Sequence, residues 1–255
     1  MAIDTQRYAR QLQLKEIGEA GQARLQRSRA LVVGLGGLGS PAALYLAAAG
    51  LGTLGLCDPD TVAISNLQRQ ILYRADQVGL AKAPTAAASL VGLNPELRVE
   101  TKAYRFAADN AAATVAGYDV VLDALDNFAD RYLLHETCYR AGIPVVSAAV
   151  GGWDGLLLTV SGEGPCYRCF FPEPPEPESL GILGAVAGTM GVLQALAAIR
   201  LLLGIGPSPV GRLLTFNGLE GRFREVRWPK DPTCPVCGDG GAKGLSCLAD
   251  RSETL

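Results

Sequence analysis

The sequence lacks both an excess of positive charge and an apolar leader. Its 255 residues include 23 Lys and Arg against 25 Asp and Glu, which gives a formal net charge of −2. Because nucleic acids and anionic membranes attract basic surfaces, neither is an expected partner. The first ten residues are polar and contain no apolar signal-peptide core, so we expect the protein to work in the cytoplasm.

Uninterrupted apolar runs and histidine are scarce as well. The nearly uncharged stretch 40–57 is divided by Gly50 and Gly52, which favours a helix followed by a buried strand over a membrane span. The only histidine, His135, receives no functional assignment. Small molecules and proteins are therefore the expected partners.

Cysteine is infrequent, but four of the seven cysteines form two Cys-x-x-Cys pairs, Cys166 with Cys169 and Cys234 with Cys237. In a long cytoplasmic chain this spacing favours metal binding over a disulfide scaffold. Four thiolates complete the tetrahedral shell of a structural zinc ion and leave no coordination position for a substrate. We therefore predict a Cys₄ zinc (Zn2+) site, with redox-active or unligated thiols as the alternatives.

An apolar strand that runs into a glycine-rich turn organises the chain. The strand residues 31–33 precede Gly-x-Gly-Gly-x-Gly at 34–39, and an Ala-rich helical segment follows at 41–49. Glycines let the backbone approach an oxyanion, and a helix N-terminus favours negative charge. Asp58 ends the next apolar segment about 20 residues on, where nucleotide-binding folds place a ribose-binding carboxylate. The pattern predicts a nucleotide site, against an ordinary strand–helix joint.

Predicted strands and helices alternate through the first 160 residues. Further strands are expected at 53–57, 97–103, 118–123, 143–149 and 155–160, and helices at 79–93, 109–115 and 128–141. Such alternation predicts an α/β fold with a doubly wound, Rossmann-like parallel sheet that binds ligands at the carboxyl ends of its strands. A long apolar helix at 181–203 and strands at 213–217 and 223–228 predict a mixed C-terminal extension that contains the zinc site.

We divide the chain into four regions within one compact domain. They are an N-terminal helical arm (1–28), a Rossmann-like ATP-binding region (29–160), a zinc-linked region (161–240) with a Pro-rich crossover loop at 172–180, and a flexible tail (241–255). The arm is expected to be interrupted at Gly18 and Gly21, because glycine weakens a helix interior.

Charged residues gather at the expected ligand edge of the sheet. Lys82 lies near a predicted helix N-terminus, where a cation is disfavoured unless an anion is close. Asp126 follows a buried strand and suits Mg2+, although it could instead cap the next helix. Together with Arg69, these residues match the needs of nucleotidyl transfer, in which charge develops on phosphate oxygens. An NAD-dependent oxidoreductase, the alternative class, would leave all three unexplained.

These segments resemble the ThiF/MoeB/HesA group of ubiquitin-activating-like adenylyltransferases over nearly the whole chain. The motifs are VGLGGLGS at 33–40, SNLQRQ at 65–70, Gly-x-x-Lys at 79–82, Asp-Asn-Phe-x-x-Arg at 126–131, Pro-Cys-Tyr-Arg-Cys at 165–169 and Cys-Pro-Val-Cys at 234–237. The resemblance implies ATP-dependent activation of a small ubiquitin-fold sulfur-carrier protein. In the reaction that the resemblance implies, the C-terminal Gly-Gly carboxylate of the carrier attacks the α-phosphate of ATP and gives an acyl-adenylate and pyrophosphate.

The resemblance also implies residue roles. Asp126 would handle Mg2+, Arg69 and Lys82 would neutralise the triphosphate, and Asp58 would hold the ribose. Arg10 would reach the ATP of the partner subunit in a homodimer. Further nucleotide contacts are implied at Gly37, Ser65, Asn66, Leu67, Gln68 and Asn127.

One departure from the family pattern concerns a cysteine. Many relatives place Cys-x-x-x-Gly just before the long helix, whereas residues 177–181 here read Pro-Glu-Ser-Leu-Gly. We therefore predict adenylation without a covalent carrier link on this loop and sulfur delivery by a separate donor protein. This favours a MoeB-like role with a molybdopterin synthase carrier over a ThiF-like role in thiamine or other sulfur-transfer pathways. A non-catalytic, zinc-bearing carrier-binding protein is a further alternative, which the intact Arg69, Lys82 and Asp126 disfavour.

Overall fold

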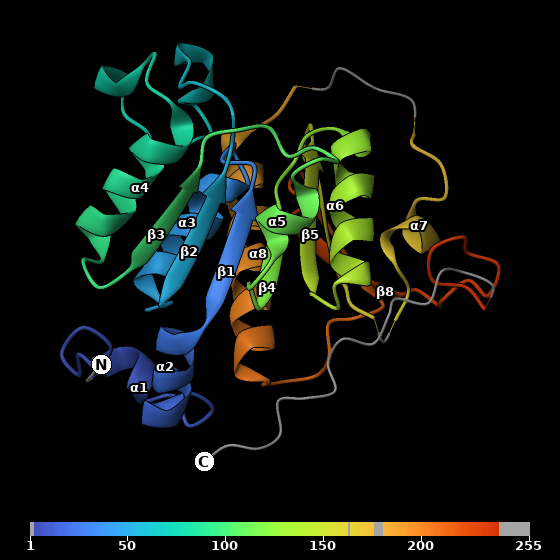
Figure 1. Cartoon of the computed structure of the whole chain (residues 1–255), viewed down its shortest axis with the longest axis horizontal. Helices are drawn as coiled ribbons and strands as arrows, with labels where there is room; N and C mark the ends of the chain where they lie inside the picture. Colours follow the sequence, from blue (N-terminus) through green and yellow to red (C-terminus); the bar gives the residue numbers. More distant parts are fainter. Residues whose placement is uncertain (1–2, 163, 176–180, 240–255) are drawn as a thin grey trace.

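The computed structural model describes residues 3–162, 164–175 and 181–239 (Figure 1). Its strands are β1 (Arg29–Val33), β2 (Thr53–Cys57), β3 (Arg98–Lys102), β4 (Val120–Asp123), β5 (Val145–Gly151), β6 (Asp154–Val160), β7 (Arg212–Asn217) and β8 (Arg222–Arg227). Its α-helices are α1 (Ala9–Leu12), α2 (Gly18–Arg27), α3 (Gly39–Ala48), α4 (Lys82–Leu93), α5 (Ala111–Val115), α6 (Phe128–Arg140), α7 (Tyr167–Phe170) and α8 (Gly184–Leu203). Short 3₁₀ turns, η1 (Ile64–Asn66) and η2 (Ala75–Gln77), lie between β2 and α4.

The strands form an eight-stranded sheet in the order β3-β2-β1-β4-β5-β6-β7-β8. The first five strands of that order are parallel, and β6, β7 and β8 extend the sheet by antiparallel pairing. The expected α/β fold, with a Rossmann-like half and a mixed C-terminal extension, is therefore confirmed.

The parallel register aligns the carboxyl ends of the central strands. Val33 at the end of β1 pairs with Cys57 at the end of β2 and with Asp123 at the end of β4, and Asp123 pairs in turn with Ser147 of β5. The loops that follow these strands consequently leave the sheet at one edge, where parallel sheets bind ligands.

Helices cover both faces of the sheet because side chains of a strand alternate between its faces. Ala30 and Val32 of β1 pack in a core cluster with α3, α4 and α8, whereas Leu31 and Val33 pack in a second cluster with α5 and α6. Burial of each such aliphatic side chain contributes roughly 1.5–3 kcal/mol. Helices packed on both faces of the sheet therefore hold its central strands in place.

Helix α8 is long and apolar enough to cross a membrane by length and composition, with a mean hydropathy of 1.8 over 18 residues. In this structure it packs against the sheet and α3, and Met190 and Ala187 are fully buried. The Gln194 Nε2 donates hydrogen bonds of 2.8 Å to the carbonyls of Asp123 and Val146. These contacts are those of a core helix.

Two local features differ from the sequence-based expectations. The arm is not interrupted at Gly21, because α2 continues from Gly18 to Arg27 through that position. There the absent side chain leaves room for Ile17 and Leu203. The short helix α7 lies inside the first Cys-x-x-Cys pair, where no helix was expected. The tail 241–255 and residues 176–180 of the crossover loop lie outside the described residues.

The close approach of α8 to α3 generates a stability prediction at Gly191. A Cβ there would lie 2.6 Å from Pro41 Cγ, whereas a Cβ at Gly188 would meet no heavy atom within 4 Å. We expect Gly191→Ala to lower the free energy of unfolding by about 1–3 kcal/mol through overpacking. Gly188→Ala is the matched control and should raise it by up to about 1 kcal/mol through helix propensity. Urea unfolding of both variants measures the difference, and equal stability would contradict the packing.

Candidate functional site

The glycine-rich turn carries the chain from β1 to α3 with a backbone that a side chain would block. Gly34 has φ = +91°, and a Cβ at this residue would lie 2.8 Å from the carbonyl carbon of Ala124. The Gly34 amide donates a hydrogen bond of 2.9 Å to the Cys57 carbonyl. The turn therefore brings the N-terminus of α3 to the carboxyl edge of the sheet, which suits an anionic ligand.

Asp58 fastens the glycine-rich turn to the end of β2. Its side chain is 6% exposed, and its two oxygens accept hydrogen bonds from the amides of Leu35, at 2.7 Å, and Asp60, at 2.9 Å. A carboxylate has about four acceptor sites, so two amide contacts leave capacity for ribose hydroxyls. The residue thus combines a structural role with the geometry that its predicted role requires.

Lys82 is the first residue of α4 and is 5% exposed. Its Nζ lies 2.9 Å from Asp60 Oδ2 and 4.0 Å from Asp58 Oδ1. The anion that the sequence required near this cation is therefore a carboxylate in this structure. The two carboxylates hold the Lys82 ammonium at the edge of the sheet where Asp58 lies. The ammonium has three donor hydrogens, so one remains for a further acceptor.

The segment 65–70 lies directly against the glycine-rich turn. Arg69 donates a hydrogen bond of 3.1 Å from Nη1 to the Ser65 carbonyl. A Cβ at Gly37 would lie 3.2 Å from Arg69 Cγ, so the arginine stem crosses the turn at that glycine. Asn66 is half-buried and accepts a hydrogen bond from the Ala63 amide, at 3.1 Å. Leu67 is half-buried, and Ser65 and Gln68 are exposed on the same segment.

Gln70, the last residue of the motif at 65–70, is expected from the sequence at the ligand edge of the sheet. It is 4% exposed, and its Oε1 has no hydrogen-bond partner among the described residues. A Cβ at Gly36 would lie 3.6 Å from its Nε2, so the amide sits against the glycine-rich turn. Only the fold reveals this unpaired buried acceptor, because the sequence gives no sign of burial in a polar loop.

Asp126 and Asn127 form the loop between β4 and α6. The N-cap of α6 is Asn127, whose Oδ1 accepts a hydrogen bond of 2.9 Å from the Asp130 amide. The alternative that Asp126 caps this helix is therefore wrong. Asp126 is exposed at the carboxyl edge of the sheet, one residue before the cap. Capping consequently does not account for an acidic residue at this position.

Arg10 is the one predicted site residue that the chain does not bring to this edge. It lies on α1, at the end of the sheet where β1 begins (Figure 1). The neighbouring Gln11 donates a hydrogen bond of 2.9 Å to the Ala49 carbonyl at the C-terminal end of α3, whereas the glycine-rich turn precedes the N-terminal end. The contribution of Arg10 to a second subunit stays a prediction.

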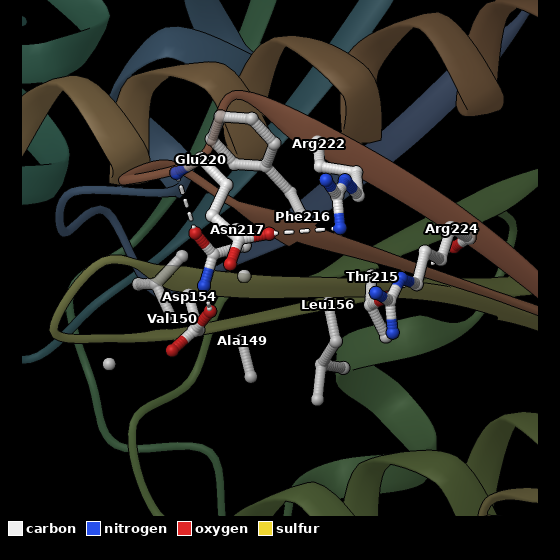
Figure 2. Close-up of a pocket in the computed structure, with 12 residues that line it drawn as sticks. Ala149, Val150, Asp154, Leu156, Thr215, Phe216, Asn217, Glu220, Arg222 and Arg224 are labelled. Carbon is white, nitrogen blue, oxygen red and sulfur yellow. Dashed lines mark hydrogen bonds and ion pairs between the residues drawn. The ribbon is translucent and has the colours of Figure 1, made fainter.

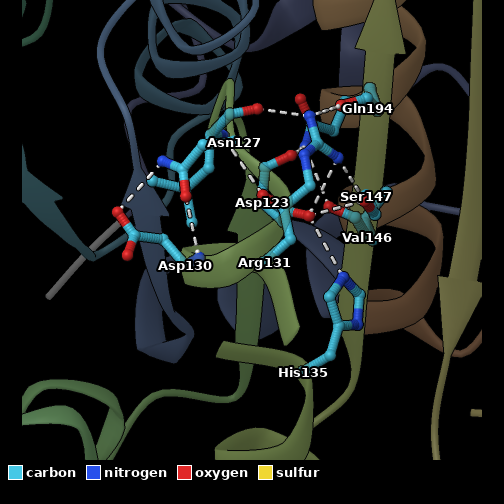
Figure 3. Close-up of polar contacts among 10 residues, drawn as sticks. Asp123, Asn127, Asp130, Arg131, His135, Val146, Ser147 and Gln194 are labelled. Carbon is cyan, nitrogen blue, oxygen red and sulfur yellow. Dashed lines mark hydrogen bonds and ion pairs between the residues drawn. The ribbon is translucent and has the colours of Figure 1, made fainter. Parts of the chain in front are cut away.

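A buried polar network beneath the β4–α6 loop was missed in the sequence (Figure 3). Asp123 Oδ2 accepts hydrogen bonds from Arg131 Nη1, at 3.1 Å, from His135 Nε2, at 3.1 Å, and from Ser147 Oγ, at 2.6 Å. Burial alone would raise the pKa of Asp123, but Arg131 and the hydrogen bonds from His135 and Ser147 hold it below its ordinary value. Asp123 is therefore an anion with no solvent contact.

His135 has a structural role that its sequence context concealed. Burial lowers the pKa of the imidazole below its ordinary value, although Asp123 acts in the opposite direction. The neutral ring therefore donates its Nε2 hydrogen to Asp123. The imidazole ring also stacks on the Tyr167 ring, with ring centroids 4.1 Å apart.

The two Cys-x-x-Cys pairs come together as predicted. Cys166 Sγ lies 4.0 Å from Cys169 and 3.4 Å from Cys234, and Cys169 Sγ lies 3.3 Å from Cys237. All four sulfurs are within 4.8 Å of one another and all four residues are buried. A tetrahedral zinc ion with bonds of about 2.3 Å would separate its ligands by about 3.8 Å. The donor set and the spacing therefore fit zinc.

The cysteine cluster is held by backbone and aromatic contacts. Trp228 donates a hydrogen bond of 2.7 Å from Nε1 to the Cys169 carbonyl, and the Gly238 amide closes the second pair on the Cys234 carbonyl at 2.8 Å. Burial raises the pKa of the Cys166 thiol and raises that of Cys237 to about 11. Burial also opposes ionisation of Cys234, yet hydrogen bonds from the backbone of Cys237 and Val236 hold the pKa of its thiol below the ordinary value. A thiolate is the form that binds metal.

A cavity of about 640 Å³ covers the antiparallel half of the sheet (Figure 2). Its lining includes Ala149 on β5, two residues beyond Ser147, which pairs with Asp123 of β4. Leu156 contributes apolar surface, and Arg222 and Arg224 contribute positive charge from β8. Because Asp154 and Glu220 also line the cavity, its surface is a mixture of apolar, acidic and basic side chains.

Comparisons with known proteins agree on one family. A family model described as the ThiF family matches residues 8–236. The "SAMP-activating enzyme E1" of Haloferax volcanii is 46% identical over 250 residues, which cover 96% of this chain and 93% of that protein. The "Adenylyltransferase and sulfurtransferase MOCS3" of Drosophila yakuba is 47% identical over 242 residues, 92% of this chain and 53% of that protein. The chain thus spans about half the length of MOCS3.

Among solved structures, E. coli MccB with succinimide superposes with a TM-score of 0.82 over 93% of this chain and 75% of that chain, at 22% identity. PaaA gives a TM-score of 0.73 at 24% identity over 88% of this chain and 82% of that chain. At such low identity these structures establish the fold alone.

The buried neutral imidazole generates a pH prediction. As the pH falls below about 6.5, His135 in the unfolded chain takes up a proton that the folded protein does not bind. The free energy of unfolding should therefore fall, by at most about 1.4 kcal/mol per pH unit. Because His135 is the only histidine, His135→Gln should show a shallower loss between pH 6.5 and 5. Urea unfolding across this range measures both slopes, and identical slopes would contradict a depressed pKa.

Proposed function

The chain belongs to the ThiF family, and we propose that it uses ATP to adenylate the C-terminal Gly-Gly carboxylate of a small ubiquitin-like sulfur-carrier protein. The relatives support this function, because one is named as an activating enzyme for SAMP and the other as an adenylyltransferase. The protein is accordingly an adenylyltransferase, with an acyl-adenylate and pyrophosphate as its products. The enzyme is proposed to be of the MoeB type, and the carrier that it activates is proposed to be the sulfur carrier of molybdopterin synthase.

The observation that carries this proposal is the convergence of one acidic and two basic side chains on the glycine-rich turn. Asp58 bonds to the Leu35 amide of the turn, Lys82 lies 4.0 Å from Asp58, and Arg69 packs across Gly37. A turn alone would suit many anionic ligands. Two cations beside it suit a triphosphate whose outer phosphates become the leaving group.

In the proposed reaction, a carboxylate oxygen of the carrier attacks the α-phosphorus of ATP. The bond from that phosphorus to the bridging oxygen breaks, and pyrophosphate leaves with the electron pair. Arg69 and Lys82 stabilise the negative charge on the leaving phosphates, and Asp58 accepts hydrogen bonds from the ribose. Asp126 would hold the Mg2+ that accompanies ATP and neutralises phosphate charge. Gly37, Ser65, Asn66, Leu67, Gln68 and Asn127 would complete the nucleotide contacts.

We propose that the carrier tail lies across the cavity over β5–β8. The lining of this cavity includes Ala149, two residues beyond Ser147, and Ser147 pairs with Asp123 at the end of β4. Residues 177–180 of the crossover loop, which contain no cysteine, lie outside the described residues. We propose that sulfur comes from a separate donor protein rather than through a thiol on that loop.

Pyrophosphate exchange into ATP, driven by a Gly-Gly-ended carrier, tests the function. We expect exchange with at least one carrier and a loss of about 100-fold or more in Arg69→Ala and in Asp126→Asn, because each removes charge stabilisation in the transition state. Arg74→Ala is the matched control, since the Arg74 side chain is 67% exposed and pairs with Asp76. It should leave exchange unchanged.

Exchange with no carrier, together with tight NADH binding, would overturn the adenylyltransferase in favour of an oxidoreductase. If the carrier carboxylate accepts the adenylyl group, any variant that no longer binds the carrier must also lose carrier-driven exchange. The same assay addresses Arg10, which we propose acts on the ATP of a second copy in a homodimer. Mixing inactive Arg10→Ala and Asp126→Asn chains should restore part of the exchange, because a mixed dimer contains one complete site.

We also propose that the four cysteines bind a structural zinc ion. The support is the buried tetrad of sulfurs and its spacing. The ion would join α7 to the segment after β8, which are separated by more than 60 residues in the sequence. It would stabilise the fold and take no part in the reaction, since four protein ligands leave no open position.

The purified protein should contain one zinc ion per chain, measured by elemental analysis. Cys234→Ser should lose the metal and several kcal/mol of stability, because metal binding free energy contributes to folding. Cys138→Ala also removes a buried thiol, but one outside the tetrad, and it should keep the metal. Equal metal content in the two variants would exclude the tetrad as the site.

A further inference from the structure

We propose that Arg131 is a positioning residue for adenylation, which holds the loop that carries Asp126 in place through an anchor on Asp123. The inference rests on the proposed function, because it gives a role in that reaction to a side chain buried beneath the loop. Arg131 is 4% exposed and belongs to the first turns of α6. Asp126 lies at the exposed tip of the loop.

The guanidinium of Arg131 joins three segments of chain (Figure 3). Its Nη1 donates to Asp123 Oδ2 and to Ser147 Oγ, both at 3.1 Å. Its Nη2 donates to the Ala148 carbonyl, at 2.8 Å, and to the Leu125 carbonyl. The residue therefore links the end of β4, the loop and β5 by one planar group.

These bonds restrain the loop on both sides of Asp126. Leu125, the preceding residue, donates its amide to Asp123 Oδ1, at 3.1 Å, and its carbonyl accepts from Arg131. Asn127, the following residue, is fixed as the N-cap of α6. The backbone that carries the Asp126 carboxylate is thus restrained on both sides, which fixes the place from which this side chain reaches a metal ion.

The anchor itself is rigid. Asp123 is fully buried and also accepts from His135 and Ser147, while Gln194 of α8 donates to its backbone carbonyl. His135 stacks on Tyr167, which lies within the first Cys-x-x-Cys pair. The Asp123 carboxylate is thus held by side chains of α6 and β5, while α8 fixes the backbone of Asp123 and α7 packs on His135.

Lysine is the informative replacement at this position. Arg131→Lys keeps the positive charge that compensates Asp123, but one ammonium nitrogen cannot reach the acceptors that two guanidinium nitrogens serve. We expect kcat for carrier-driven exchange to fall about 10- to 100-fold. The KM for Mg2+ should rise by a similar factor while the KM for the carrier stays near the wild-type value.

A double-variant comparison shows whether Arg131 acts through Asp126. In an Asp126→Asn background, Arg131→Lys should cause little further loss, because the carboxylate that it positions is already absent. Binding of Mn²⁺ with a non-hydrolysable ATP analogue, followed by electron paramagnetic resonance, gives a readout independent of turnover. This binding should weaken in Arg131→Lys as the KM for Mg2+ does.

Arg140→Lys is the matched control, since it makes the same exchange at the exposed end of the same helix. It should alter neither kcat nor Mn²⁺ binding. If Arg131→Lys does not fold, the paired change Asp123→Asn with Arg131→Gln removes both buried charges and should reproduce the weaker Mn²⁺ binding.

Three results would overturn this inference: unchanged Mg2+ dependence and Mn²⁺ binding, additive losses in the double variant, or equal effects of Arg140→Lys. These three results differ from failure of the proposed function, because failure of that function would leave the unaltered protein without exchange with any carrier.

Discussion

The parallel pairing of β1 with β2 and β4 is the constraint on which the proposed nucleotide site depends. Val33 pairs with Cys57 and with Asp123, so three strands end at one level. The backbone of Gly34 then passes so close to Ala124 that no side chain fits between them. Every candidate residue of this edge follows one of these strands or packs on the turn. The positions of the side chains are therefore a consequence of register.

Much of this arrangement was predictable because it is encoded by short segments. Apolar strands, the glycine-rich turn and the Cys-x-x-Cys pairs are local patterns, and parallel topology brings the strand ends to one edge. The two cysteine pairs were correctly joined although the cysteines in contact are 68 residues apart in the sequence, because four thiolates form a complete tetrahedral set. Chemistry supplied the long-range information in that instance.

The features that were missed depend on partners that are distant in sequence. His135 gave no signal because its acceptor, Asp123, lies 12 residues away on β4, and only the fold brings the two side chains together. Whether Asp126 or Asn127 caps α6 depends on the residue at which the helix begins, and a shift of one residue changes the answer. Likewise, the pairing of Lys82 with Asp60 requires the loop after β2 to fold back on α4. Local pattern placed these residues near the edge but could not assign their partners.

The two outer strands of the sheet, β3 and β8, have a consequence for how the protein coexists with its neighbours. A strand with unpaired backbone groups is a template for another chain, and charged side chains are a common deterrent. β3 carries Arg98, Glu100 and Lys102, and β8 carries Arg222, Arg224, Glu225 and Arg227. Any strand that docked along either border would have to desolvate these charges. The charges on both outer strands therefore disfavour edge-to-edge pairing with other chains.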